Sequence, residues 1–281
     1  MTTDGSRTVL VTGAAGGIGL AVCRRLVADG WRVVAAVHPS EDAAQLERSG
    51  VDRIERADLA DDSSVEALLV RLATEPRWDA LISIAGIAIP GPLEGIPHPA
   101  LRRQLDVNAL APMRLAQALL PALRDAEGRL VFVGAGQGRV ALPFGGPYGA
   151  SKAALAALTD ALRAELDGSG VQVILIEPGA IRTGILASST AAAHEILDAM
   201  PPHLAARYRA RVAGVLARSE SAFAHARAPE ELAALIARVL AAPRPKPRYL
   251  FGRDARALAL VALLPAVLRA RLVARLGKAP S

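Results

Sequence analysis

The sequence predicts an α/β fold, a doubly wound parallel sheet with helices on both faces. Short apolar runs rich in β-branched residues alternate with longer stretches of helical periodicity. Most of the short runs are apolar throughout, which is typical of parallel strands that are buried on both faces. The expected strands are residues 8–13, 32–37, 53–57, 79–86, 129–134 and 171–179.

The stretches between these strands have the marks of helices. We expect a first helix over 17–29, and a helix over 61–75 that opens with acidic and serine caps. A long helix is expected over 99–124, bent by Pro112, and another over 148–166. Because crossovers between parallel strands are right-handed, these elements predict a Rossmann-type fold.

We expect one domain over residues 1–252, followed by an extension at 253–281. The alternation of strands and helices stops between about 184 and 228. An insertion of this length at the carboxyl ends of the strands suits a lid over a substrate. A helix that packs on the domain or contacts another subunit is the alternative.

The C-terminal extension is predicted to be an amphipathic helix. Its apolar run, 257–268, contains Pro265 and is shorter than the ~20 apolar residues of a transmembrane helix. Beyond it, arginines alternate with leucines at helical spacing. The extension could pack on its own domain, contact a partner subunit, cover the substrate cleft or make weak contact with an anionic membrane surface.

Composition narrows the class of protein. The formal net charge is +6, but arginines are spread along the chain and aromatic residues make up only 3%, so we expect no nucleic-acid partner. Cys23 is the single cysteine, and the N-terminus lacks the pattern of a secretory signal, so we expect a cytoplasmic protein. The histidines are not spaced as ligands, and we expect no metal site.

The segment TGAAGGIG, Thr12–Gly19, joins the first expected strand to the first expected helix. Glycines there let the backbone turn tightly and approach a pyrophosphate, whose charge the helix N-terminus favours. This position predicts a dinucleotide-binding site. The second strand ends in Val37, His38 and Pro39, without the carboxylate that binds the ribose of NAD. NADP(H) is therefore slightly favoured over NAD(H), with His38 either in a phosphate site or in a plain surface turn.

Tyr148 and Lys152 are four residues apart, so they fall on one face of the expected helix. A lysine ammonium beside a phenol favours the phenolate and lowers the tyrosine pKa. Tyr148 would then exchange a proton with a carbonyl or alcohol while a nicotinamide exchanges a hydride. An incidental pair on a helix surface is the alternative.

With these motifs in order, the chain resembles the short-chain dehydrogenase/reductase family over about residues 7–252. The resemblance rests on TGAAGGIG, on Asp58-Leu59, on Asn108, on YGASK at 148–152 and on PGAIRT at 178–183. It implies a seven-stranded parallel sheet whose last strand is RYLFG, 248–252, and a homodimer or homotetramer.

The resemblance also implies roles for single residues. Asn108, Tyr148 and Lys152 would be catalytic, with Asn108 helping to hold a water that links Lys152 to solvent. Tyr148 and Lys152 would also contact the cofactor. The other cofactor-binding residues would be Thr12, Gly13, Gly17, Ile18 and Gly19 at the pyrophosphate, His38, Asp58 and Leu59 near the adenosine, Ala85 and Gly86 near the ribose, and Pro178, Gly179, Ile181 and Thr183 at the nicotinamide.

Two positions depart from the family pattern. The catalytic serine, thirteen residues before the tyrosine, is Ala135 here, and losing one such donor typically costs ~10²–10³ in rate. Gln137 carries an amide that could replace it, and a water or a group of the substrate are the alternatives. The second asparagine of the family's Asn-Asn-Ala-Gly is Ile84, which cannot make the same polar contacts.

Two functions therefore stay open. The first is an NAD(P)-dependent oxidoreductase that interconverts a carbonyl and a secondary alcohol. Its substrate would be hydrophobic, because similar basic C-terminal extensions occur in family members that act on steroid-like and retinoid-like compounds. The second is a non-redox enzyme that uses Tyr148 for cyclisation, dehydration or isomerisation, or a protein that binds a ligand or partner without turnover.

Overall fold

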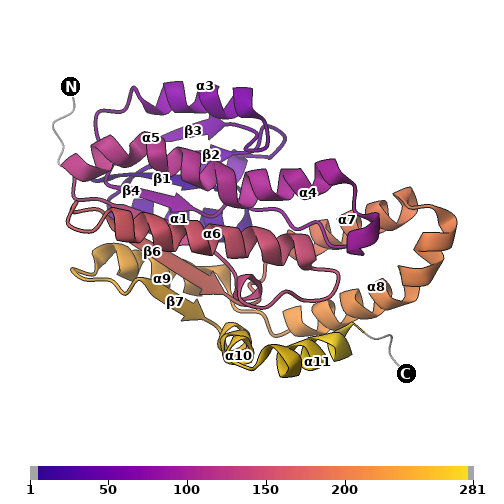
Figure 1. Cartoon of the computed structure of the whole chain (residues 1–281). Coiled ribbons are helices and arrows are strands. Elements are labelled where there is room, and N and C mark those ends of the chain that lie inside the picture. Colours follow the sequence, from indigo (N-terminus) through magenta and orange to yellow (C-terminus); the bar gives the residue numbers. More distant parts are fainter. Residues whose placement is uncertain (1–5, 278–281) are drawn as a thin grey trace.

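A seven-stranded parallel sheet forms the centre of the molecule (Figure 1). The computed structural model describes residues 6–277. The strand order is β3-β2-β1-β4-β5-β6-β7, which confirms the predicted doubly wound fold. The strands are β1 (Thr8–Thr12), β2 (Arg32–Val37), β3 (Arg53–Arg56), β4 (Ala80–Ser83), β5 (Arg129–Val133), β6 (Gln172–Pro178) and β7 (Arg248–Phe251).

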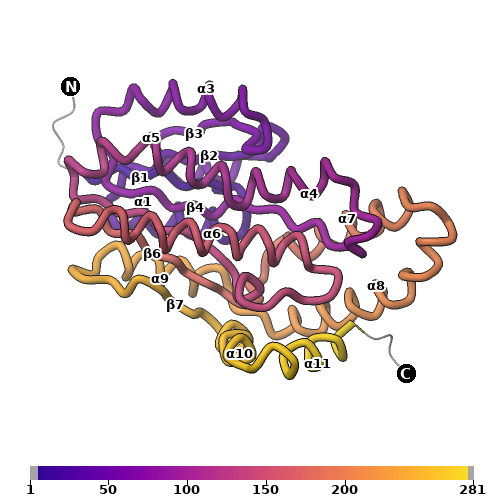
Figure 2. Tube along the Cα trace, viewed as in Figure 1, coloured from indigo at the N-terminus to yellow at the C-terminus, as the bar shows by residue number. Residues whose placement is uncertain are grey.

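Helices cover both faces of the sheet and bury two apolar clusters. On one face, α1 (Gly17–Ala28) packs against α9 (Pro229–Ala241), and the short α2 (Ala44–Glu47) adds Leu46 to the same cluster. On the other face lie α3 (Asp62–Leu72), α5 (Ala111–Asp125) and α6 (Gly146–Glu165), seen at the front of Figure 2. β1, β4 and β5 are buried along nearly their whole length, which explains their unbroken apolar sequences.

The expected long helix over 99–124 is divided into three segments. These are α4 (His98–Leu105), a π-helical turn (Asp106–Leu110) and α5. The interruption precedes Pro112, which lacks an N–H and therefore cannot bond to the carbonyl of Asn108 four residues earlier. Within the π turn the amide of Ala111 bonds to the carbonyl oxygen of Asp106, five residues earlier, and Asn108 is fully buried. The sequence predicted one helix with a bend at Pro112, whereas the structure has two α-helices joined by a π turn before Pro112.

The segment between β6 and α9 forms two helices, α7 (Ile185–Ala199) and α8 (Pro202–Phe223). They extend beyond the sheet at the right of Figure 1 and enclose a third, smaller apolar cluster. The C-terminal extension forms α10 (Arg253–Ala262) and α11 (Ala266–Leu276), separated at Pro265. Its last four residues, 278–281, lie outside the described part of the chain. None of the helices within residues 6–277 has the length and apolar character needed to span a membrane.

Candidate active site

The carboxyl ends of the central strands meet at one edge of the sheet. Thr12 pairs with Ser83, Ser83 pairs with Phe132, and Val133 pairs with Ile176 in the parallel ladders. The segments that follow β1, β4, β5 and β6 therefore emerge together. This register brings together the predicted site residues that are more than a hundred positions apart in the chain.

The glycine turn after β1 is a tight cradle of backbone. Gly13 has a φ of +65°, and a Cβ there would lie 2.7 Å from the Cα of Ala85. A Cβ on Gly19 would lie 2.1 Å from the carbonyl oxygen of Gly13. Gly17 begins α1 and faces Thr183, whose methyl group lies 3.0 Å from the position of a Cβ on Gly17. Ile18 packs on the apolar cluster behind the turn.

Thr12 fixes the start of this cradle against the neighbouring strand. Its side-chain oxygen accepts hydrogen bonds from the amides of Ile84 and Ala85, at 3.2 and 3.3 Å. Ile84 itself packs on the apolar cluster that contains α1 and α9. The residue that departs from the family pattern is thus accommodated by packing, while its backbone keeps a polar contact.

A second group of predicted residues lies after β2 and β3. His38 Nε2 is 3.5 Å from a carboxylate oxygen of Asp58, and His38 Nδ1 is 2.8 Å from Ser40 Oγ. Both ring nitrogens therefore have partners. Glu41, which the sequence reading did not single out, accepts a hydrogen bond of 2.8 Å from the amide of His38. Leu59 packs on the apolar cluster beneath α3 and α5.

Tyr148 and Lys152 lie one turn apart on α6, as expected. The Lys152 ammonium is 5.9 Å from the centre of the Tyr148 ring and donates a 3.0 Å hydrogen bond to the carbonyl oxygen of Val133. Gly86 lies directly beside it, since a Cβ on Gly86 would be 3.4 Å from Lys152 Nζ. The ammonium is thus held between α6, the end of β5 and the segment after β4.

Burial dominates the ionisation of this pair. It raises the pKa of Tyr148 to about 12 and lowers the pKa of Lys152 to about 8. The direction for Tyr148 is opposite to the expectation from the sequence. Desolvation by burial is the cause of both shifts, and Tyr148 keeps its proton at neutral pH.

The side chain of Asn108 ties the π turn to the rest of the site. Its amide nitrogen donates to the carbonyl oxygen of Ile87 and to Ser151 Oγ, both at 2.9 Å, and its oxygen accepts from the amide of Ile87 at 2.8 Å. Ser151 in turn donates to the carbonyl oxygen of Tyr148 at 2.8 Å. The sequence reading missed Ser151, although it lies inside the YGASK motif.

Ala135 is buried at the end of β5, and a short 3₁₀ turn (Gly136–Gly138) follows it. Gln137 lies half-buried on this turn, beneath the start of α6. Its Oε1 is 3.1 Å from the position that a Cβ on Gly145 would take, three residues before Tyr148. The Gln137 amide therefore lies close to the first residues of α6, the helix that carries Tyr148.

The segment after β6 is held by the C-terminal extension. Asp254, at the start of α10, accepts a hydrogen bond of 2.6 Å from the amide of Ala180, and its carboxylate fills the space where a Cβ on Gly179 would lie. Pro178 ends β6, and Ile181 is buried. The sequence reading did not assign Asp254 to the site, because nothing in its local pattern indicates a contact 74 residues away.

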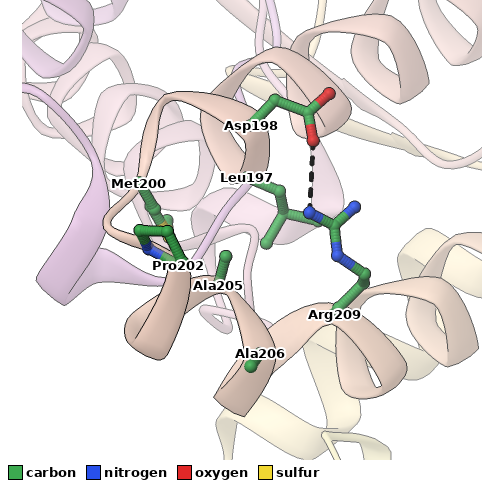
Figure 3. Close-up of a pocket in the computed structure, with 7 residues that line it drawn as sticks. All are labelled: Leu197, Asp198, Met200, Pro202, Ala205, Ala206 and Arg209. Carbon is green, nitrogen blue, oxygen red and sulfur yellow. Dashed lines mark hydrogen bonds and ion pairs between the residues drawn. The ribbon is translucent and has the colours of Figure 1, made fainter.

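A cavity of about 230 Å³ lies between α7 and α8, with Asp198 and Arg209 paired at 3.2 Å at its rim (Figure 3). Its lining consists of residues 197–209 only. None of the predicted site residues reaches it. It is therefore a feature of the α7–α8 pair and not of the active-site edge.

The sequence model of the short chain dehydrogenase family matches residues 7–194, more than half of the chain. The chain belongs to the short-chain dehydrogenase/reductase family. Human 17-beta-hydroxysteroid dehydrogenase type 1 is 34% identical over 254 residues, which cover 86% of this chain and 76% of that protein. The NADPH-dependent 3-dehydrocapnine reductase of Ornithobacterium rhinotracheale is 36% identical over 190 residues, 64% of this chain and 67% of that protein.

A solved short-chain dehydrogenase from Streptomyces avermitilis has the same fold. It superposes with a TM-score of 0.76 over 97% of this chain and 96% of its own, at 26% identity. Family members are oxidoreductases that use NAD(P), and the glycine cradle at the start of α1 fits such a dinucleotide. A Cβ on Gly13 would collide with the backbone of Ala85, and one on Gly19 with the carbonyl oxygen of Gly13. Glycine at these positions therefore permits the tight turn at the N-terminus of α1, where a phosphate would bind.

Proposed function

We propose that the protein is an NADPH-dependent reductase that converts the carbonyl group of an apolar small molecule to a secondary alcohol. The observation that carries this proposal is the position of Tyr148 and Lys152 beside the glycine cradle. Gly86 lies within contact of Lys152 Nζ, and Ala85 closes against Gly13. These contacts support a proton donor and a dinucleotide-binding turn that act together at one edge of the sheet.

The preference for NADPH rests on the end of β2. The nearby carboxylate of Glu41 is engaged by the amide of His38, and the carboxylate of Asp58 lies beside the His38 ring. In proteins that bind NAD, a carboxylate at the end of the second strand binds the ribose hydroxyls. Neither Glu41 nor Asp58 stands at that position at the end of β2. Arg56 reaches the same loop through the carbonyl oxygens of Pro39 and Glu41, which adds a positive charge near it. The related 3-dehydrocapnine reductase is named as NADPH-dependent.

The chain's own residues would move the proton. When bound, NADPH supplies the hydride that adds to the carbonyl carbon. The Tyr148 hydroxyl, which is protonated at neutral pH, would donate its proton to the carbonyl oxygen. Lys152, held by the Val133 carbonyl, places a positive charge next to the phenolate that forms.

Gln137 would replace the missing serine. Its amide starts from the turn that follows Ala135 and lies against the first turn of α6. A hydrogen bond from this amide to the carbonyl oxygen would stabilise the negative charge that develops there. The absence of a hydroxyl at Ala135 is also the one observation that favours the alternative, a non-redox reaction at Tyr148.

An apolar substrate suits the apolar cluster that α7 and α8 form with the segments after β4 and β5. Phe144 and Tyr208 meet edge to face at 6.1 Å, and Ile89 and Ile96 pack on the cluster formed by α7 and α8. The related human enzyme is named for a hydroxysteroid, which is also a largely apolar molecule. We therefore assign α7 and α8 as the lid over the substrate.

The test is an assay of NADPH oxidation against a panel of bulky apolar ketones and aldehydes. We expect turnover with at least one of them and a loss of ~10²–10⁴ in kcat for Tyr148→Phe. The matched control is Tyr249→Phe in the edge strand β7, whose hydroxyl accepts from the amide of Lys246 and which is not among the predicted site residues. Equal activity of wild type and Tyr148→Phe would contradict the proposal.

A further inference from the structure

The helices α10 and α11 carry apolar side chains that the rest of the described chain leaves uncovered. None of the residues of α11 is buried. Leu263 and Val267, on either side of Pro265, are 81% and 63% exposed. We call the following residues the C-terminal apolar face: Leu260, Leu263, Val267, Leu268, Leu272 and Leu276.

The exposed residues of α11 form ordered rows. Leu268, Leu272 and Leu276 follow one another at intervals of four and therefore make one ridge along the helix. Arg271 and Arg275 form the adjacent row, also four apart and also exposed. The opposite side of α11, which includes Ala270 and Val273, faces residues 139–141 across a cleft of about 370 Å³.

Several contacts hold the two helices in place. Arg211 and Arg218 of α8 donate hydrogen bonds to the carbonyl oxygens of Gly277 and Leu276, at 3.0 and 2.6 Å. Ala255 and Leu258 of α10 lie against Gly136. These contacts fix the helices that carry the C-terminal apolar face, and both helices lie at the lower margin of Figure 1.

The charged side chains of α10 and α11 are nearly all positive. Residues 253–277 contain the arginines 253, 256, 269, 271 and 275, and Asp254 is their single acidic residue. Asp254 points inward, because its carboxylate accepts from the amide of Ala180. An outward surface of leucines beside arginines remains, and long arginine side chains can reach phosphates while the leucines enter the acyl region.

We propose that the C-terminal apolar face docks on an anionic lipid surface. Leu263 and Val267 at the turn, with the ridge of α11, would enter the boundary between headgroups and acyl chains, and Arg271 and Arg275 would bind lipid phosphates. A second copy of the chain suits the face less well, because two such surfaces would bring their arginines together. The proposal does not depend on the reductase activity.

The test is co-sedimentation of the full chain with phosphatidylglycerol vesicles and with phosphatidylcholine vesicles, at low and high salt. We expect binding to the anionic vesicles that weakens as salt rises. The triple variant Leu263→Gln/Val267→Gln/Leu268→Gln should lose at least about tenfold in affinity while keeping every charge. The apolar control is Val70→Gln, because Val70 is 69% exposed on α3.

The contribution of charge is tested separately. Arg271→Gln/Arg275→Gln should weaken binding, whereas Arg48→Gln/Arg124→Gln, which removes two exposed arginines elsewhere, should not. Absence of binding to anionic vesicles, or equal binding by the triple variant and wild type, would overturn the proposal. A wild-type dimer that the triple variant dissociates, without vesicle binding, would show that a second copy occupies the face instead. Native mass spectrometry of both proteins distinguishes that outcome.

Discussion

Arg139 and Glu177 form a two-pronged ion pair beneath the active-site edge. The guanidinium of Arg139 donates to the two carboxylate oxygens of Glu177 at 2.9 and 2.6 Å, and Glu177 is only 1% exposed. Arg139 follows the turn that carries Gln137, and Glu177 lies in β6 just before Pro178. The pair therefore joins two of the segments that build the site.

Replacing Arg139 should leave a buried carboxylate with little compensation. Within residues 6–277, Arg248 is the other cation paired with Glu177, at 3.6 Å. We expect Arg139→Met to lower the free energy of unfolding by about 3 kcal/mol, because an uncompensated buried charge is costly. Urea denaturation followed by circular dichroism measures this change.

The matched control for that measurement is Arg114→Met. Arg114 also binds two carboxylates, those of Asp62 and Glu66, but both are well exposed to solvent. Its loss should cost at most about 1 kcal/mol. Equal losses in the two variants would show that burial of Glu177 does not matter.

The buried ammonium of Lys152 should make stability depend on pH. Its pKa is about 8 in the folded chain and 10.5 in the unfolded reference, so the unfolded chain binds more protons between these values. Stability therefore rises with pH through this window, by up to about 3 kcal/mol from this group. Lys152→Met removes the effect.

The measurement is the free energy of unfolding of wild type and Lys152→Met at pH 7 and pH 10. The difference between the two proteins should shift in favour of wild type at the higher pH. Lys246→Met, at an exposed position, is the control. Its free energy of unfolding should change with pH as that of wild type does. A pH-independent difference would contradict the assignment of a lowered pKa to Lys152.

Gly13 should tolerate no side chain. Its φ of +65° disfavours other residues, and a Cβ would also collide with Ala85. Gly30 has a similar φ of +81° but nothing within 4 Å of the Cβ position. We expect Gly30→Ala to cost about 1–2 kcal/mol and Gly13→Ala a further ~1–3 kcal/mol. Gly30→Ala measures the backbone strain alone, and Gly13→Ala adds the collision with Ala85. Thermal unfolding of both variants therefore separates the two effects. Equal melting temperatures would show that the collision costs nothing.

The amide of Gln137 and the hydroxyl introduced by Ala135→Ser should be interchangeable sources of one hydrogen bond. Gln137→Ala should lower kcat/KM for carbonyl reduction by ~10²–10³, since it removes the donor that we assign to the carbonyl oxygen. Adding Ala135→Ser to that variant should restore most of the loss. Steady-state assays of the single and double variants decide this. If Gln137→Ala is fully active, or Ala135→Ser rescues nothing, Gln137 does not have this role.

Much of the fold could be predicted because buried parallel strands leave a local signature. The apolar runs at β1, β5 and β6 gave the positions of these strands to within one or two residues. The π turn at Asp106–Leu110 could not be predicted, because it depends on the long-range bonds of Asn108 with Ile87 and Ser151. Only the missing N–H of Pro112 is visible in the sequence.

The site was predictable where a motif carries the chemistry and unpredictable where tertiary contacts do. The spacing of Tyr148 and Lys152 placed both on one helical face. The spacing of the two residues carries no information on their burial, and it therefore predicted a lowered pKa for Tyr148, whereas burial raises it. The contacts of Asp254 with Ala180 and of Arg139 with Glu177 join segments far apart in the chain, and no local pattern marks them.

The central claim, that the glycine cradle and the Tyr148–Lys152 pair form one nicotinamide-dependent site, is tested most directly by calorimetric titration. Purified protein would be titrated with NADPH, NADP, NADH and NAD in turn. We predict micromolar binding of NADPH, weaker binding of NADH, and loss of both in Gly13→Ala. Absence of binding for all four nucleotides would contradict hydride transfer at this site and would leave Tyr148 as the centre of a non-redox reaction.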